Sequence, residues 1–474
     1  MKNIFKVGVL SVAMLSAVGC GDFGDINIDP NNTTSVAPET LLTSSLRSVA
    51  SVVGRTDEMF YTQMWSQTQY TDGSRYVTVN YDFNGWYTGP LADLNHIIEI
   101  NSNEDTKADA LVSGSNENQI AVAKIMKAFF FHFMTDRWGP LPYSQALQGR
   151  TNLKPSYDDQ ETIYLDLIKE LKEAVAMMGG ASVKGDFILG GNMAHWAKFA
   201  NSIRATIAMR MSNVNPSLAQ TEFVDAVGDG VITTADENVM YPYQADANNQ
   251  NPWFAAFITR TDFAISETLV DYMKPLNDPR LNVYADPAPL YGDVRGMPYG
   301  IENAGDIPND EISFPGFPAV RGQDAPIAVF TGAQMHFLLA EAALKGWVSG
   351  DAQAFYEGGI AESMKQWGVY DDAAFADFIA QDGVAWDASK GMELIGYQKW
   401  VALYLQGAES WAEWRRTGYP VLTPAPDPLN ADGQIPRRHG YPTSERDINS
   451  DNYASAVQML GGPDELSTRL WWDN

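Results

Sequence analysis

Residues Glu409–Pro420 read ESWAEWRRTGYP. Trp411 and Trp414 lie three residues apart, so in a helix they share one face, and such a pair more often fills a core than binds a ligand. Arg415 and Arg416 follow directly. A guanidinium can bind a carboxylate through two parallel hydrogen bonds, and it can also hold a neighbouring loop through backbone carbonyls. We therefore expect this stretch to lock the fold rather than to contact a ligand.

Two other stretches have the same character. Residues 136–138, Asp-Arg-Trp, end an apolar run, and Pro140 and Pro142 follow them. Proline has no backbone N–H and disrupts a helix interior, so these prolines should stop the helix. We expect residues 136–138 to lock a helix end, and Arg437 and Arg438 to hold later loops in the same way.

The composition limits what the 474-residue chain can do. Apolar residues make up 45% of it, which is enough for a sizeable core. Its 59 acidic and 32 basic residues give a net charge of −27. Such a surface repels phosphate backbones, so no nucleic-acid partner is expected. One cysteine and five histidines allow neither an internal disulfide nor a cysteine-rich zinc site, and we expect no cofactor and no metal.

Apolar spacing predicts a mainly helical chain. Tyr164, Leu167, Ile168 and Leu171 recur at helical intervals, and Asp158 or Asp159 is the expected N-cap. Pairs such as 334–347 and 352–367, joined by a short turn, suggest tetratricopeptide-like hairpins. The expected helices cover residues 39–54, 57–70, 86–101, 117–137, 159–178, 193–213, 216–228, 333–347, 351–367, 389–406 and 408–417.

Three long segments are expected to be irregular. Residues 229–332 are rich in Pro, Gly, Asn, Asp and aromatic residues, and 70–89 and 418–474 resemble them in composition. Loops of this length in a globular protein usually carry function. The fold class is therefore all-α, with helix pairs packed against long aromatic-rich loops.

The N-terminus has the build of an exported lipoprotein. Lys2 and Lys6 precede the short apolar run Val7–Val18, and small residues precede Cys20, the single cysteine. A cysteine in this position resembles a bacterial lipobox, where it is acylated and becomes the mature N-terminus. We expect 1–19 to be the signal peptide, 20–38 a lipidated tether and 39–474 one domain.

Several stretches resemble the SusD/RagB family of nutrient-binding outer-membrane lipoproteins, in the SusD-like branch that carries the Trp-Arg-Arg signature. Their order and spacing match the family from the lipobox to the C-terminus. They are Asp136–Tyr143, Pro155–Tyr164, Lys198–Arg204, Ala208–Arg210, Asn277–Leu281, Phe337–Ala343, Glu409–Pro420, Ile435–Arg438 and Leu470–Trp472.

The resemblance implies four helix pairs of tetratricopeptide type and no catalysis. It also implies a lipid-anchored protein, exposed on the surface of the outer membrane, which binds an oligomeric nutrient. Such a protein would act as the lid of a SusC-like TonB-dependent transporter. No family motif in this sequence transfers a ligand site.

Ligand residues are therefore sought in the aromatic loops, because sugar rings stack on flat aromatic faces and their hydroxyls need polar partners. Segments 70–89 and 248–257 are better candidates than any single residue. The candidate residues are Asp72, Arg75, Tyr76, Tyr81, Asn84, Trp86, Tyr87, Asn251, Trp253, Tyr291, Arg295 and Arg321.

Alternatives remain open at this point. The aromatic, Asn-rich loops favour an oligosaccharide, but an oligopeptide could use the same platforms. A secreted all-α glycan-cleaving enzyme would need two carboxylates about 5–10 Å apart in a cleft, and no pair stands out. A purely scaffolding helical-repeat protein would leave the long aromatic loops unexplained.

The anchor can be tested directly. A Cys20→Ala variant is expected to lose lipid labelling and to leave the membrane fraction, because stable anchoring requires the acyl chains. Metabolic labelling with a fatty-acid analogue, followed by fractionation, measures both. A variant that stays anchored would contradict the lipobox and the outer-membrane localisation together.

Overall fold

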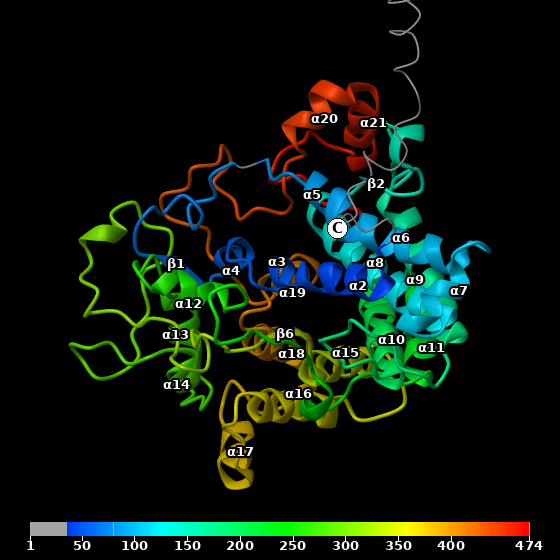
Figure 1. The fold of residues 1–474 in the computed structure, drawn as a ribbon. Helices are drawn as coiled ribbons and strands as arrows, with labels where there is room; N and C mark the ends of the chain where they lie inside the picture. The colour runs from blue at the N-terminus through cyan, green and yellow to red at the C-terminus, as the bar shows by residue number, and fades with distance from the viewer. Residues whose placement is uncertain (1–35, 79, 474) are drawn as a thin grey trace, which may run out of the picture. The chain divides into compact units, whose positions relative to one another are not determined.

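The computed structural model describes residues 36–78 and 80–473, so the predicted signal peptide, Cys20 and most of the predicted tether lie outside the described residues. The compact unit runs from Pro38 to the C-terminus, and helices dominate it (Figure 1). Its first ten helices are α2 (Pro38–Arg47), α3 (Ala50–Val53), α4 (Asp57–Tyr61), α5 (Asn84–Trp86), α6 (Ala92–Ser102), α7 (Lys107–Ala110), α8 (Asn116–Trp138), α9 (Gln160–Met177), α10 (Met193–Arg210) and α11 (Pro216–Gly228).

The later helices are interspersed with loops. They are α12 (Pro252–Phe257), α13 (Glu267–Met273), α14 (Leu281–Tyr284), α15 (Gly332–Leu344), α16 (Ala352–Gln366), α17 (Asp372–Ile379), α18 (Gly391–Ala402), α19 (Gly407–Thr417), α20 (Thr443–Ile448) and α21 (Ser450–Leu460). Among the helices of the described residues, none is long and apolar enough to cross a membrane.

Consecutive helices pack as pairs, as the sequence predicted. The pairs are α8 with α9, α10 with α11, α15 with α16 and α18 with α19, and α10 also contacts α9 and α15. Helix α9 shows why the sequence folds this way. The side chain of Asp159 accepts a hydrogen bond from the Thr162 N–H at 2.8 Å and caps the helix. Ile163, Leu167 and Leu171 point into the core.

In the part of the chain that the structure describes, three two-stranded antiparallel ladders hold the loops. β4 (Val239–Tyr241) pairs with β6 (Ile327–Phe330), so the long segment leaves the helices and returns to them at one place. β1 (Trp65–Gln67) pairs with β5 (Phe263–Ile265) and fastens the middle of that segment. β2 (Leu141–Pro142) pairs with β3 (Tyr157–Asp158).

Some predicted boundaries were wrong. The helix expected over 57–70 ends at Tyr61, because residues 65–67 pair with β5 instead. The helix expected over 86–101 is interrupted at Gly89, which has non-helical dihedral angles before Pro90. The segments 229–332 and 418–474 also contain short helices, so they are less irregular than the composition suggested.

The stretch Glu409–Pro420 locks the fold as expected. Trp411 is fully buried, and its indole N–H donates to the Pro436 carbonyl at 2.7 Å. Arg415 donates to the carbonyls of Asp136 and Arg437 at 2.7 and 2.8 Å. This side chain therefore joins the end of α8 to a loop about three hundred residues away in the sequence.

A buried ion network joins four helices. Glu413 of α19 accepts hydrogen bonds from Arg210 of α10, from Lys399 of α18 at 2.7 Å and from Arg416 at 2.7 Å. Arg416 also binds both oxygens of Glu341 on α15. Burial alone would raise the pKa of the Glu413 carboxyl, but Arg416, Lys399 and Arg210 hold that pKa well below its ordinary value.

A Glu413→Gln variant is expected to lower the free energy of unfolding by about 3–5 kcal/mol, because it leaves buried cations without their partner. Urea unfolding measures this. The matched control is Glu104→Gln, in an exposed pair with Lys107, which should change stability by less than about 1 kcal/mol. The difference between Glu413→Gln and wild type should shrink below about pH 4.3, where an ordinary glutamate becomes protonated. Equal effects of the two substitutions would contradict a central role for Glu413.

Candidate functional site

The structure divides the predicted site residues into buried and exposed groups. Tyr76 is fully buried, and its hydroxyl accepts a hydrogen bond from the Ala425 N–H at 3.0 Å. Arg75 donates to the Asp427 carbonyl at 2.6 Å. Both residues pin the 70–78 loop against the C-terminal loops, while Asp72 is exposed. Tyr76 therefore offers no face on which a ligand could stack.

Residues 81–87 are mostly used in packing. Tyr81 is half-buried against His439, with ring centroids 4.7 Å apart. Trp86 is buried between Phe130 and Phe133, which excludes it from the ligand surface. The Trp86 ring fills the space between α5 and α8, while Tyr81 packs against the C-terminal loop that carries His439.

Asn84 and Tyr87 line a surface cleft. The Asn84 amide donates to the Ser444 hydroxyl at 3.1 Å, and the Tyr87 hydroxyl donates to the Pro142 carbonyl at 2.6 Å. The cleft has an open volume of about 1380 Å³, and the loop that carries Asn152 and Leu153 forms its other side. The polar side chains of Asn84, Tyr87 and Asn152 in this cleft are already hydrogen-bonded to the protein.

Asn251 and Trp253 are interior residues, contrary to the expectation for segment 248–257. The Asn251 side chain caps α12 by accepting from the Trp253 and Phe254 N–H groups, and it donates to the Ala325 carbonyl at 2.8 Å. Trp253 packs edge-on against Trp65. Because these hydrogen bonds occupy the Asn251 side chain and Trp253 is buried, neither residue is available to contact a ligand.

Exposed aromatic rings instead lie beneath arginines. Across residues 36–78 and 80–473, the aromatic side chains with the largest exposure are Tyr70 (70%), Phe317 (58%), Tyr291 (48%) and Phe187 (36%). Three of them have a guanidinium over the ring, and we call these the aromatic–arginine pairs. The pairs and their distances from guanidinium carbon to ring centroid are Tyr70 with Arg260 (4.7 Å), Tyr291 with Arg295 (4.0 Å) and Phe317 with Arg321 (5.6 Å).

The three pairs stand on connected loops around α12–α14, on the opposite side of Figure 1 from α8–α11. The Asn309 amide donates to the Thr261 hydroxyl at 3.0 Å, next to Arg260. The Ser313 N–H donates to the Arg295 carbonyl at 2.8 Å. Thus the loop 306–313 bridges the first and second pairs.

The third pair is fixed by one carboxylate. Asp286 forms an ion pair with Arg321 and accepts a hydrogen bond from the Phe317 N–H at 3.0 Å. Arg321 also lies over Phe257, 5.3 Å from its ring centroid. The ring and its arginine are therefore held in place before any ligand arrives.

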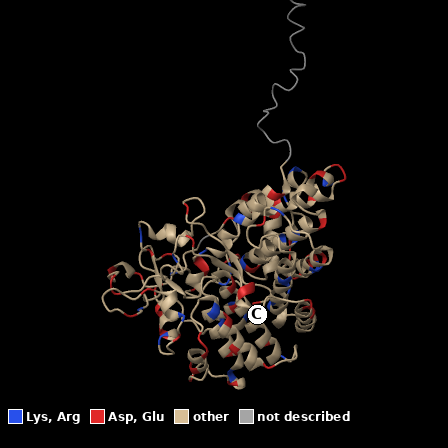
Figure 2. Cartoon of the chain, turned by 60° about the horizontal axis from the view of Figure 1, so that its bottom comes forward, with Lys and Arg blue, Asp and Glu red and all other residues tan. Residues whose placement is uncertain are grey.

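Each arginine in the pairs has an acidic partner. Arg260 pairs with Asp262 and Arg295 with Asp293. Hydrogen bonds from Lys274 and Arg295 lower the pKa of the Asp293 carboxyl, so it stays ionised. Figure 2 shows acidic residues spread over both helices and loops. The pairs thus combine flat apolar faces with fixed donors and acceptors but little local net charge.

Of the residues in the aromatic–arginine pairs, the sequence analysis named Tyr291, Arg295 and Arg321 and included Tyr70 only through segment 70–89, whereas Phe317 and Arg260 were not among its candidates. One signal was present. Tyr291 and Arg295 are four residues apart in YGDVR, and Phe317 and Arg321 are four apart in FPAVR. Both pairs share one pattern: an aromatic residue, two further residues and then Val-Arg, in a loop rich in Gly and Pro. The Tyr70 pair is formed across the β1–β5 ladder region, and no local pattern predicts it.

The arrangement can stack and hydrogen-bond a ligand. In the part of the chain that the structure describes, no three His, Cys, Asp or Glu side chains come together in a way that could hold a metal ion. Flat aromatic faces beside fixed hydrogen-bond donors and acceptors are groups that a ligand could stack on and hydrogen-bond to.

Comparisons with known proteins show which family and which solved structures the chain resembles. Residues 30–442 match the SusD-like family model described as "Starch-binding associating with outer membrane". A solved chitin-binding protein is 30% identical, with a TM-score of 0.80 over 92% of this chain and 99% of that one. A chitin-binding SusD homologue from Flavobacterium johnsoniae is 25% identical, with a TM-score of 0.74 over 92% and 98% of the two chains. No curated protein sequence gives a significant match.

Proposed function

Because the chain belongs to the SusD-like family of proteins associated with the outer membrane, we propose that it is a non-catalytic, lipid-anchored protein that binds an oligosaccharide on its aromatic–arginine pairs. The observation that carries the proposal is the exposure of three aromatic rings, each held by an arginine, on one connected set of loops. Sugar rings stack on such faces, and the arginines and aspartates can bind hydroxyl groups.

A chitin-type oligosaccharide is the first ligand to test. Two similar solved structures are described as chitin-binding. An N-acetyl group offers a methyl for apolar contact and an amide for hydrogen bonds with side chains such as Arg295 and Asp293. An oligopeptide is the second candidate, because its carbonyls and N–H groups could use the same partners.

The ligand class can be decided with a binding panel. We expect N-acetylglucosamine oligomers to bind with measurable heat, and linear α-glucans and mixed oligopeptides to bind at least tenfold more weakly. The oligomers should be recovered at their original length after long incubation, since no hydrolysis is proposed. Shortened products would support the glycan-cleaving alternative, and tighter binding of peptides would support the peptide alternative.

The site can be tested by ring removal. Tyr70→Ala, Tyr291→Ala and Phe317→Ala are each expected to weaken binding of the preferred oligomer by roughly fivefold, corresponding to about 1 kcal/mol per stacked ring. Calorimetric titration measures this. Phe187→Ala is the matched control, because Phe187 is an exposed aromatic ring that packs against Tyr241 and, among residues 36–78 and 80–473, has no arginine over it. If the Phe187 variant loses as much affinity as the others, the pairs are not the site.

We further propose that the protein is the lid of a SusC-like TonB-dependent transporter. The family assignment supports this partnership. The protein is expected to co-purify with a large barrel protein from detergent extracts, and its deletion should stop uptake of the preferred oligomer. A protein that always purifies alone and whose deletion leaves uptake intact would contradict the lid role but not ligand binding.

A further inference from the structure

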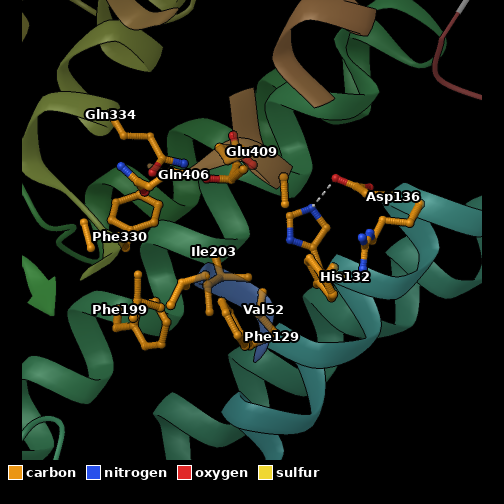
Figure 3. A pocket seen from close by; sticks show the side chains of 18 residues that line it. Val52, Phe129, His132, Asp136, Phe199, Ile203, Phe330, Gln334, Gln406 and Glu409 are labelled. Atoms are coloured by element: carbon orange, nitrogen blue, oxygen red, sulfur yellow. Dashed lines mark ion pairs between the residues drawn. The ribbon is translucent and has the colours of Figure 1, made fainter. Parts of the chain in front are cut away.

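The interior pocket in Figure 3 differs from the loop surface in how its groups are used. It lies among α3, α8, α10, α15 and α19, and its apolar rings contact one another. The Phe199 ring centroid lies 6.0 Å from that of Phe129 and 6.4 Å from that of Phe330. The His132 imidazole faces the Asp136 carboxylate at 3.3 Å (Figure 3). These contacts belong to the packing of the helices, whereas the most exposed aromatic rings lie on the loops that carry the aromatic–arginine pairs.

Exposed aliphatic side chains accompany two of the three aromatic–arginine pairs. Leu290, which is 56% exposed, directly precedes Tyr291. Ile258, which is 60% exposed, lies two residues before Arg260. Consecutive Cα atoms are about 3.8 Å apart, so the chain itself keeps each of these side chains close to its pair. An exposed aliphatic residue is common on a protein surface, but beside a stacking ring it adds apolar surface that a substituent of a sugar can cover.

Backbone hydrogen bonds hold both aliphatic residues in place. The Leu290 N–H donates to the Asp310 carbonyl at 2.8 Å, and Asp310 belongs to the loop 306–313 that bridges the first two pairs. Ile258 follows the last residue of α12, and its N–H donates to the Ala255 carbonyl at 3.4 Å. Each aliphatic side chain is therefore presented from a fixed backbone.

The arginines of these two pairs have hydrogen-bond donors to spare. The Arg260 and Arg295 side chains are 53% and 46% exposed. Within the described residues, Arg260 uses Nη2 to pair with Asp262, and Arg295 uses Nε to pair with Asp293. A guanidinium has five N–H donors, so the others can bind a carbonyl oxygen of a ligand. The two carboxylates can accept a hydrogen bond from an amide N–H of the same ligand.

The third pair has no such set of groups. Arg321 is only 25% exposed and lies between the rings of Phe257 and Phe317. Its Nε donates to the Pro315 carbonyl at 2.6 Å, and its Nη2 pairs with Asp286. Among residues 36–78 and 80–473, no exposed large aliphatic residue lies within three positions of Phe317. This pair therefore offers a ring for stacking and little else.

An N-acetyl group needs an apolar contact for its methyl group and a donor for its carbonyl oxygen. We propose that Ile258 with Arg260, and Leu290 with Arg295, form two acetamido subsites, and that Phe317 stacks on a sugar without sensing its N-acetyl group. These subsites presuppose the oligosaccharide function proposed above and give it a specificity. Covering one methyl group contributes roughly a fourfold gain in affinity, so the two aliphatic residues decide between N-acetylated and plain sugar chains.

The test compares N-acetylglucosamine oligomers with cello-oligosaccharides of equal length, whose units carry a hydroxyl in place of each N-acetyl group. Calorimetric titration of the full-length protein is expected to show at least tenfold tighter binding of the N-acetylated oligomer, because two gains of roughly fourfold multiply. Equal affinities would overturn the acetamido subsites and leave oligosaccharide binding intact. Binding of neither oligomer would overturn the oligosaccharide function itself, and the subsites with it.

Variants assign the preference to residues. Leu290→Ala and Ile258→Ala should each weaken the N-acetylated oligomer roughly fourfold and leave the cello-oligosaccharide unchanged. Phe317→Ala should weaken both oligomers by the same factor. Leu111→Ala is the matched control, because Leu111 is 55% exposed and lies next to α7, outside the loops that carry the pairs. It should change neither affinity.

Saturation-transfer NMR provides a second readout. The acetyl methyl protons of the bound oligomer should receive strong saturation from the wild-type protein and much less from the Ile258→Ala, Leu290→Ala double variant. Circular dichroism and the unfolding midpoint check that each variant is folded. A folded double variant that keeps the full preference for the N-acetylated oligomer would overturn the assignment, and so would a Phe317→Ala variant that loses this preference.

Discussion

The buried carboxylate of Glu413 is the contact on which the helix arrangement depends. It lies on α19 and meets cations from α10 and α18, while Arg416, one turn away, carries the network to Glu341 on α15. A charge placed in a low-dielectric interior is costly unless its partners are in position. Because the partners come from four helices, these helices can pack in few other ways without leaving a charge unpaired.

The positions of the loops depend on how these helices pack. Segment 229–332 starts after α11 and ends at α15, and the β4–β6 ladder pairs its first part with its last. The β1–β5 ladder then fixes its middle against the first part of the chain. Long loops lose much conformational entropy when they become ordered, and these ladders reduce the freedom that remains at the aromatic–arginine pairs. A preorganised surface of this kind loses less conformational entropy when a ligand binds to it.

The sequence by itself determined the elements whose signals are local. The helical spacing around Leu167, the Asp159 cap and the pairing of neighbouring helices were all predictable, because each depends on residues within one or two turns or across a short connection. The burial of Trp411 and the clamping role of Arg415 were predictable from residue type. Only the tertiary structure decided which aromatic residues stay exposed. Trp253 and Tyr291 both occur in Pro- and Asn- or Gly-rich loops, yet Trp253 is buried against Trp65 while Tyr291 remains open beneath Arg295. Burial depends on contacts between residues nearly two hundred positions apart, and no local pattern in a single sequence encodes them.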